Sequence, residues 1–186
     1  MKLLIASDIH GALPAAERVV QLFEQHRCDL LCLLGDLLNY GPRNGVPQGL
    51  DAPGIAALLN RHAGHIIAVR GNCDSEVDQM LLRFPIMADY ALIADGTRRI
   101  FLTHGHVFNE EQMPALEGID YFFYGHTHLP HILPAADGRP LICNTGSITF
   151  PKGGNPPTLG IMADGAITLY NFDTLQPVAT HALPKR

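Results

Sequence analysis

The chain has 186 residues, a hydrophobic fraction of 47%, a charged fraction of 17% and a formal net charge of −5. These values predict a folded protein with one substantial core, and they exclude an intrinsically disordered chain. The acidic balance and the lack of a basic cluster argue against a nucleic-acid-binding surface.

No break in composition marks a domain boundary, so we expect a single domain over residues 1–186. No stretch is long enough to span a membrane. The apolar run that begins at Met1 is too short for a signal peptide, because Asp8 and His10 interrupt it. The four cysteines show no metal-type pairing, and we interpret them as reduced thiols of a cytoplasmic protein.

The first half of the chain alternates strands and helices. Apolar runs predict three buried strands, at residues 2–6, 29–34 and 65–69. Helical patterns predict three helices, at residues 14–26, 54–62 and 75–82. Pro14 favours the start of the first helix, and Ser75 is expected to cap the third. Residues 39–54 are rich in Gly, Pro and Asn and are expected to form a long loop. This order predicts parallel strands joined by right-handed crossovers.

After Pro85 the strand-like runs become closely spaced. They lie at residues 86–93, 98–103, 120–124, 130–134, 140–143, 158–162, 166–172 and 177–182. The tripeptide Ala-Asp-Gly separates neighbouring runs at 94–96, 136–138 and 163–165, which is typical of hairpins. The two halves together predict an α/β fold in which a two-sheet β-sandwich is flanked by α-helices.

Polar segments follow five of the predicted strands. They are Asp8-Ile9-His10, Gly35-Asp36, Gly71-Asn72-Cys73-Asp74, His104-Gly105-His106 and Gly125-His126-Thr127-His128. Parallel neighbours bring their carboxyl ends to one edge of a sheet, so these segments are expected to converge. In an extended stretch, residues two apart point the same way, so His126 and His128 project to one face.

The side chains in these segments form a candidate metal site without thiolates. The candidate metal ligands are Asp8, His10, Asp36, Asn72, His104, His126 and His128. Mixed oxygen and imidazole ligands suit Mn²⁺, Zn²⁺, Fe or Co²⁺. The set exceeds what one tetrahedral site needs and suits two metals with one bridging carboxylate. Two such metals clamp the attacking and leaving oxygens of an in-line displacement at phosphorus.

The five segments, in this order, resemble the motifs of the calcineurin-like metallophosphoesterases over about residues 1–160. The short length and the segments 70–74 and 144–147 are similar to the small bacterial phosphodiesterase branch. The resemblance implies a four-layer αββα sandwich and attack on phosphorus by a bridging water or hydroxide. It also implies that Asp8, His10 and His128 bind one metal, that Asn72, His104 and His126 bind the other, and that Asp36 bridges them.

The chain departs from this pattern at Cys73. Many phosphatases of the superfamily carry a histidine after Gly-Asn, and that histidine protonates the leaving group. A thiol of ordinary pKa is a poor acid near neutral pH. Either another group serves, with His106 the nearest by sequence, or the enzyme depends on leaving groups that need little protonation. The alternative to a catalytic role is that Cys73 is a small residue that fills a gap beside Asn72.

Arg70 and Lys152 are cations next to the motif segments. The guanidinium of Arg70 suits a phosphate oxygen, but it can equally pair with Asp74 or Asp78. Lys152, in the loop 150–157, is a candidate for attracting phosphate. The candidate catalytic residues are therefore Asn72, His106 and Arg70.

We expect a metal-dependent phosphodiesterase that acts on a small-molecule phosphodiester and uses two divalent metals, with Mn²⁺ as the first choice. Three alternatives stay open: a phosphomonoesterase acting on nucleotides or phosphoproteins, a non-catalytic protein-interaction scaffold of the same fold, and a nuclease with the same metal core. The lack of a basic cluster favours diesters, and the complete ligand set argues against a scaffold. A homodimer or homotetramer through the sheet-rich half is also open.

Overall fold

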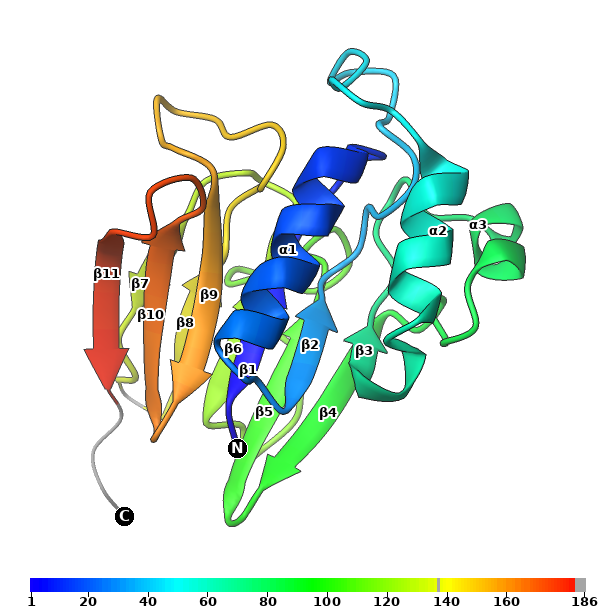
Figure 1. Ribbon diagram of the computed structural model, residues 1–186. Coiled ribbons are helices and arrows are strands. Elements are labelled where there is room, and N and C mark those ends of the chain that lie inside the picture. The colour runs from blue at the N-terminus through cyan, green and yellow to red at the C-terminus, as the bar shows by residue number, and fades with distance from the viewer. Residues whose placement is uncertain (137, 183–186) are drawn as a thin grey trace.

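The computed structural model describes residues 1–136 and 138–182, and within these residues two β-sheets lie face to face (Figure 1). The first sheet has the spatial order β11, β10, β9, β1, β2, β3. Its strands are β1 (Leu3–Ala6), β2 (Leu30–Leu33), β3 (Ile66–Ala68), β9 (Thr158–Ala163), β10 (Ala166–Asn171) and β11 (Pro177–Ala182). The pairs β1–β2 and β2–β3 are parallel, as the alternation of strands and helices predicts, and β9 joins β1 in the antiparallel sense.

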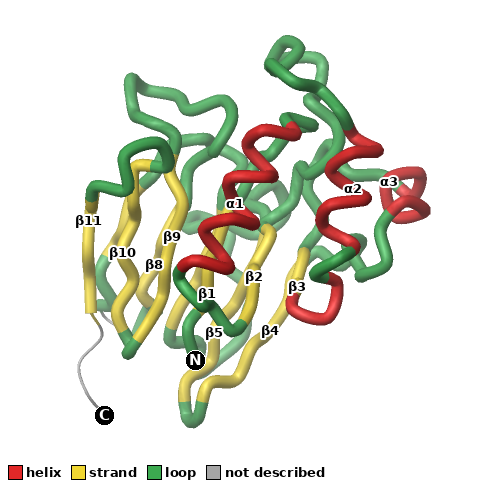
Figure 2. Tube along the Cα trace, in the orientation of Figure 1, coloured by secondary structure: helices red, strands yellow, loops and turns green. Residues whose placement is uncertain are grey.

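The helices of the described residues are α1 (Leu13–Gln25), α2 (Ala52–Asn60) and α3 (Glu76–Leu81), with a short 3₁₀ turn, η1 (Ala63–His65), before β3. Two of these three helices, α1 and α2, lie on the outer side of the first sheet, whereas α3 lies beyond its β3 edge (Figure 2). Pro14 lies in the first turn of α1, and Ser75 caps α3 in a reciprocal capping box with Asp78. The α2 helix begins two residues earlier than predicted, because the Asp51 side chain accepts a hydrogen bond from the Gly54 N–H and caps it.

The second sheet has the spatial order β4, β5, β6, β8, β7. Its strands are β4 (Tyr90–Asp95), β5 (Arg98–Thr103), β6 (Tyr121–Tyr124), β7 (His131–Leu133) and β8 (Leu141–Asn144). The predicted strand at 86–93 begins only at Tyr90, because the backbone before it bonds elsewhere. Ile86 N–H donates to the Gln79 side chain, and the carbonyl of Ala88 accepts from Arg70 N–H.

The prediction of two packed sheets flanked by helices is confirmed, but the fourth layer is not helical among the described residues. The outer face of the second sheet is instead covered by the irregular segment 105–120. Three of its side chains pack against that face: Phe108, Met113 and Ile119. They bury the aromatic face formed by Phe101, Phe122, Tyr124 and Ile142, so an irregular segment supplies the cover that a helix would give.

Alternate residues along the central strands enter different cores, as the period of a β-strand requires. In β1, Leu4 and Ala6 face the helices, whereas Leu3 and Ile5 face the second sheet. The strand is therefore buried on both faces and provides a rigid base for the polar residues that follow it.

Two of the predicted Ala-Asp-Gly hairpins are confirmed. The turns at 94–96 and 163–165 join β4 to β5 and β9 to β10 in antiparallel pairs. The third tripeptide, 136–138, includes residue 137, which lies outside the described residues. The helices of the described part of the chain are too short or too polar to cross a bilayer.

Candidate metal centre

The strands that precede the five polar segments end at one edge of the sandwich. These strands are β1, β2 and β3 of the first sheet and β5 and β6 of the second, which are parallel within each sheet. The segments after them bring all the predicted ligands together, as the distances below show. Two longer loops rise at the same end, one between β2 and α2 and one between β8 and β9 (Figure 1).

Glycines allow the strand ends to approach this closely. A Cβ atom on Gly125 would collide with the Ser7 hydroxyl and would lie 2.8 Å from Asp8 Oδ2. A Cβ atom on Gly71 would collide with the Asp36 carboxylate. The glycines of the Gly-Asn and Gly-His segments are therefore required for packing one strand end against the next.

The first group of candidate ligands consists of Asp8, His10 and His128. Asp8 Oδ1 lies 3.3 Å from His10 Nε2 and 3.1 Å from His128 Nε2. The two imidazole Nε2 atoms lie 3.4 Å apart. The Asp8 carboxylate is fully buried, and its Oδ2 accepts from the Ser7 hydroxyl and from the His126 backbone N–H.

The second group consists of Asn72, His104 and His126. His104 Nε2 lies 3.1 Å from Asn72 Oδ1 and 3.2 Å from His126 Nδ1. His104 is fully buried, whereas Asn72 is exposed to the cleft above it.

Asp36 lies between the two groups. Its Oδ2 atom is 3.7 Å from His10 Nε2 and 3.5 Å from His104 Nε2. Its Oδ1 atom accepts a hydrogen bond of 2.7 Å from the Cys73 N–H, which fixes the orientation of the carboxylate. This is the position that a bridging ligand needs.

The histidine tautomers show that these residues fit divalent cations. The Nδ1 atoms of three rings lie next to backbone carbonyls: His10 next to Asn39, His104 next to Leu34 and His128 next to Phe150. With Nδ1 donating to a carbonyl, the Nε2 atom of each ring is the one that faces the carboxylates or other polar atoms of the cluster, and it is free to hold a proton or a metal ion there. These atoms repel one another unless a proton or a metal cation lies between them, and imidazole nitrogens, carboxylate oxygens and amide oxygens are suitable metal ligands.

The pKa shifts of these side chains follow from the charged groups that surround them. Burial by itself would raise the pKa of Asp8, but hydrogen bonds from His10 and His128 hold it well below its usual range. Burial would lower the pKa of His104, but the hydrogen bond to Asp36 and the nearby carboxylates raise it to about 9. Burial and the charge on His104 lower the pKa of His126 to about 4.

The backbone is strained at the same positions. Five of the candidate ligands have a positive φ, between 53° and 64°: Asp8, His10, Asp36, His126 and His128. Residues other than glycine rarely adopt this conformation, and such strain gathers at functional sites, where the surrounding structure enforces it. The ligands are therefore held in place by the ends of the strands and not only by their own preferences.

Asp74 holds the segments of the site together, a role that the sequence motifs did not reveal. Its buried carboxylate accepts backbone N–H groups from Asp36, Leu37 and Gly71, at 2.8, 2.9 and 2.7 Å. Burial nevertheless raises the pKa of this carboxyl group. Asp74 thereby ties the segment after β3 to the segment after β2 and positions Asp36.

The structure also places the candidate catalytic residues. Arg70 donates from Nε and Nη2 to Asp89 Oδ1, at 3.1 and 2.6 Å, and forms no hydrogen bond with Asp74 or Asp78. A phosphate contact by Arg70 would have to use the part of the guanidinium that Asp89 leaves free. The His106 ring packs against the rings of His104 and His126, and its buried Nδ1 has no hydrogen-bond partner among the described residues.

Cys73 sits between the candidate metal centre and the loop after β2. A Cβ atom on Gly41 would lie 2.8 Å from the Cys73 Sγ, and Asn72 Nδ2 donates to that sulfur at 3.2 Å. Burial and the charge of Asp36 raise the pKa of the thiol to about 12. The side chain therefore fills the space between Asn72 and Gly41 as a thiol that stays protonated unless a metal ion binds it.

A cleft of about 640 Å³ opens over the candidate metal centre. Its wall includes four of the candidate ligands, Asp36, Asn72, His126 and His128, together with Cys73 and Thr127. The loop after β2 adds Asn39, Gly41, Pro42, Arg43 and Asn44, and the loop after β8 adds Lys152. Sequence reasoning missed Arg43 and Asn44, because nothing in their spacing links them to the motif segments.

Comparisons with known proteins agree with this geometry. The calcineurin-like phosphoesterase superfamily domain matches residues 1–164. Phosphodiesterase YfcE of Escherichia coli strain K12 is 48% identical to this chain over 183 residues, and the match covers 98% of both chains. Phosphodiesterase MJ0936 of Methanocaldococcus jannaschii is 27% identical over 169 residues, and the match covers 87% of this chain and 92% of the other. A solved structure of YfcE, described as a phosphoesterase from E. coli, has a TM-score of 0.93 at 47% identity and covers 99% of this chain and 100% of the other. The chain belongs to the calcineurin-like phosphoesterase superfamily.

Proposed function

We propose that this protein is a metal-dependent phosphodiesterase with two divalent ions. The observation that carries the proposal is the cluster of potential ligand atoms around Asp36, in which the Nε2 atoms of three histidines and two carboxylates converge. The high identity to a relative named as a phosphodiesterase, over nearly the whole chain, supports the reaction class.

The proposed ligand sets follow the two groups of residues. Asp8, His10 and His128 would hold one ion, Asn72, His104 and His126 the other, and Asp36 both. When bound, the two ions lower the pKa of a shared water, which supplies the nucleophile, and neutralise charge on the phosphate. Mn²⁺ is the proposed metal, because it accepts a mixture of carboxylate, amide and imidazole ligands.

The surrounding residues orient this machinery. Carbonyls of Asn39, Leu34 and Phe150 fix the tautomers of three ligands, and Asp74 holds Asp36. Such outer contacts keep a ligand in its binding orientation before any ion arrives. We propose that Asn72 also contacts the substrate phosphate, because it faces both the cleft and His104.

The next question is which side chain donates a proton to the leaving group. Cys73 is neutral and its pKa of about 12 makes it a poor acid at neutral pH. We propose that His106 serves where an acid is needed, since its Nδ1 has no partner among the described residues, although burial and the charge on His104 lower its pKa. If no group of the site supplies this proton, the reaction would instead favour esters whose leaving groups need little protonation.

A phosphomonoesterase is the second candidate function, and one observation favours it. Arg43 and Lys152 line the cleft, although no basic cluster is visible in the sequence. A monoester phosphate carries more negative charge than a diester phosphate, so cations near the metals would favour it.

The remaining proposals concern the whole molecule. We propose one domain over residues 1–186, in keeping with a match that covers residues 1–164. We also propose a cytoplasmic location, which suits four free cysteines, three of them buried. A homodimer or homotetramer remains a prediction from the sheet-rich half of the sequence.

The test of the proposed function is hydrolysis of bis(p-nitrophenyl) phosphate and of p-nitrophenyl phosphate by protein stripped with a chelator. Adding Mn²⁺ should restore hydrolysis of the diester and give much slower hydrolysis of the monoester. Faster hydrolysis of the monoester would favour the phosphatase alternative. Folded protein without turnover in any divalent metal would contradict both.

A further inference from the structure

Two cations face the cleft without a partner among the described residues. The Arg43 and Lys152 side chains line the cleft over the metal centre, yet neither forms a hydrogen bond or ion pair with any residue that the structure describes. Asp36 is the one carboxylate among the described residues of the cleft wall, and its oxygens face His10, His104 and the Cys73 N–H. Both side chains are exposed to solvent, and in a chain of net charge −5 two cations at one cleft raise the local attraction for anions.

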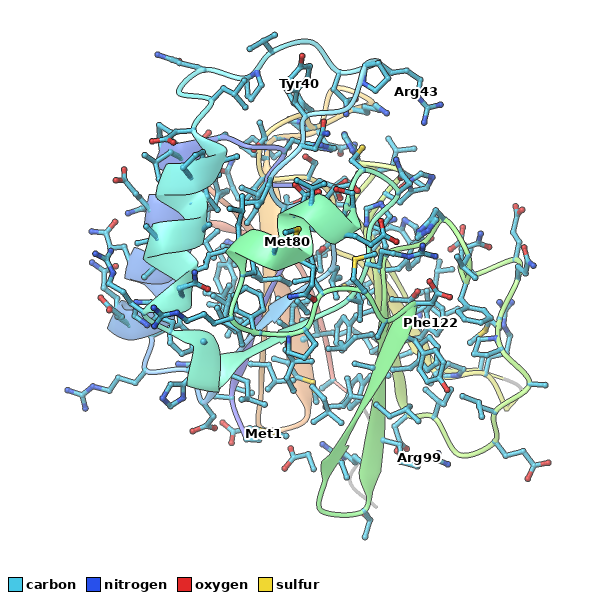
Figure 3. All side chains as sticks on the ribbon, turned by 90° about the vertical axis from the view of Figure 1, so that its right-hand side faces the viewer. Met1, Tyr40, Arg43, Met80, Arg99 and Phe122 are labelled. Atoms are coloured by element: carbon cyan, nitrogen blue, oxygen red, sulfur yellow. The ribbon has the colours of Figure 1, made fainter. Side chains whose placement is uncertain are left out.

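Arg43 is carried by a turn that is tied to a metal ligand. The Asn39 carbonyl accepts from His10 Nδ1, and the Asn39 side chain accepts from the Gly41 N–H. The Asn44 side chain, directly after Arg43, donates to the Tyr40 carbonyl and lies 3.4 Å from His10 Nε2. The turn 39–44 is therefore part of the structure that holds His10, and Figure 3 shows Tyr40 and Arg43 together at this end of the molecule.

Lys152 is held in the same way from the other side. Its backbone N–H donates to the His128 carbonyl at 3.1 Å, and its own carbonyl accepts from the Asn155 N–H and side-chain amide. His128 in turn points Nδ1 at the Phe150 carbonyl, two residues before Lys152. The backbone of each cation is therefore tied to a proposed metal ligand, His10 for Arg43 and His128 for Lys152, and both histidines are proposed to bind the same ion.

The balance of charge shows why a diester phosphate alone does not need these cations. On the proposed function, the charge of two divalent ions is balanced by the carboxylates of Asp8 and Asp36, the nucleophilic hydroxide and the single charge of a diester phosphate. Arg43 and Lys152 remain as excess positive charge. The cleft volume of about 640 Å³ is in the range of pockets that hold ligands much larger than a simple dialkyl phosphate.

Resting on the proposed phosphodiesterase activity, we propose that Arg43 and Lys152 bind a second phosphate group of the substrate, one that is not cleaved. The planar guanidinium of Arg43 matches two phosphate oxygens, and the Lys152 ammonium adds a point charge. The substrate class is then a phosphodiester that carries a separate phosphate, such as a nucleotide derivative with two phosphorylated positions.

The test compares two substrates that differ only in this group. One is the p-nitrophenyl ester of thymidine 5′-phosphate, and the other is the same ester with an additional 3′-phosphate. The reacting phosphorus and the leaving group are identical, so the ratio of the two kcat/KM values isolates the second phosphate. We expect the 3′-phosphorylated ester to be favoured about tenfold or more at low salt, and the ratio to fall as salt is added.

Variants then assign the effect to the two cations. Arg43→Gln and Lys152→Gln should each lower the ratio several-fold, and the double variant should bring it to about one. Arg61→Gln is the matched control, because Arg61 lines a different groove, between α1 and α2, and its loss changes the net charge equally. A ratio at or below one in the unchanged protein, or a ratio that the double variant retains, would overturn the proposal.

A binding measurement separates this inference from the proposed activity. Calorimetry with Mn²⁺-loaded protein would compare thymidine 3′,5′-bisphosphate with thymidine 5′-phosphate. If no ester is hydrolysed but the bisphosphate binds more tightly, and the double variant removes the difference, the proposed activity fails and the anion site stands. If both esters are hydrolysed equally and both nucleotides bind equally, the activity stands and the second-phosphate site is wrong.

Discussion

The Nε2 atoms of His10 and His128 lie 3.4 Å apart, while the Nδ1 atom of each ring lies within hydrogen-bond distance of a backbone carbonyl. With Nδ1 donating to a carbonyl, the Nε2 atoms of both rings face each other and the buried Asp8 carboxylate, so a proton or a metal ion has to lie among them. The protein therefore holds together groups that repel in the absence of a positive charge. This arrangement is the physical basis of the proposed metal centre and of the predictions that follow.

Divalent metal should stabilise the fold. A ligand that binds only the native state at a hundred times its Kd stabilises by about 2.7 kcal/mol. For a chain of this size we expect a rise in Tm of about 5–10 °C when Mn²⁺ is added to chelator-treated protein. Differential scanning calorimetry would measure it, with Ca²⁺ as a comparison ion that these imidazole ligands suit poorly. An unchanged Tm at saturating Mn²⁺ would speak against the centre.

His126→Ala should remove one of the two proposed ions. His126 lies at the rim of the second group, so its loss should leave Asp8, His10 and His128 in place. We expect kcat/KM to fall by at least about a hundredfold, because loss of an outer contact alone costs about 10–100-fold in metal sites and this substitution removes a proposed ligand. Metal analysis of the purified variant should give about one Mn²⁺ less per chain. His62→Ala, in the groove between α1 and α2, is the control and should keep both activity and metal content.

Cys73→Ala should have a much smaller effect than His126→Ala. The thiol has a pKa of about 12 and packs against the loop at Gly41, so it serves as neither acid nor nucleophile near neutral pH. We expect kcat/KM for bis(p-nitrophenyl) phosphate to change by less than about tenfold, whereas a general acid contributes a hundredfold or more. A loss as large as that of His126→Ala, at equal metal content, would show that the thiol takes part in the chemistry.

Asp74→Ala should destabilise the protein and disturb Asp36. The substitution leaves three buried backbone N–H groups without their acceptor, those of Asp36, Leu37 and Gly71. Each such group costs about 1–3 kcal/mol, so we expect the free energy of unfolding to fall by about 3–5 kcal/mol. Urea unfolding would measure this. Asp74→Asn keeps one acceptor oxygen and should lose less, and equal losses for the two variants would contradict the assigned role.

Much of this architecture could be predicted from the sequence because its signals are local. Buried parallel strands appear as short apolar runs, and Ser75 and Pro14 mark helix starts by their own chemistry. The predictions were wrong where contacts outside the local segment determine its structure. The strand expected at 86–93 starts late because Gln79 and Arg70 take up its backbone groups, and the outer layer over Phe101 and Phe122 is an irregular segment.

The same contrast holds for the candidate site. The motif segments predicted which side chains converge, because parallel strands share one edge. They did not predict the partner of Arg70, which is Asp89, or the meeting of Arg43 and Lys152 at one cleft. Loop conformation determines both, and no periodicity in the sequence records it. The left-handed backbone at Asp8, Asp36 and His126 is likewise imposed by tertiary structure.

The most direct test of the central claim is anomalous X-ray diffraction from crystals grown with Mn²⁺, recorded at the manganese edge. The account predicts two anomalous peaks per chain, one bound by Asp8, His10 and His128, the other by Asn72, His104 and His126, with Asp36 in contact with both. Two ions in these positions would establish the binuclear centre. A single peak at saturating Mn²⁺, or peaks away from Asp36, would contradict it.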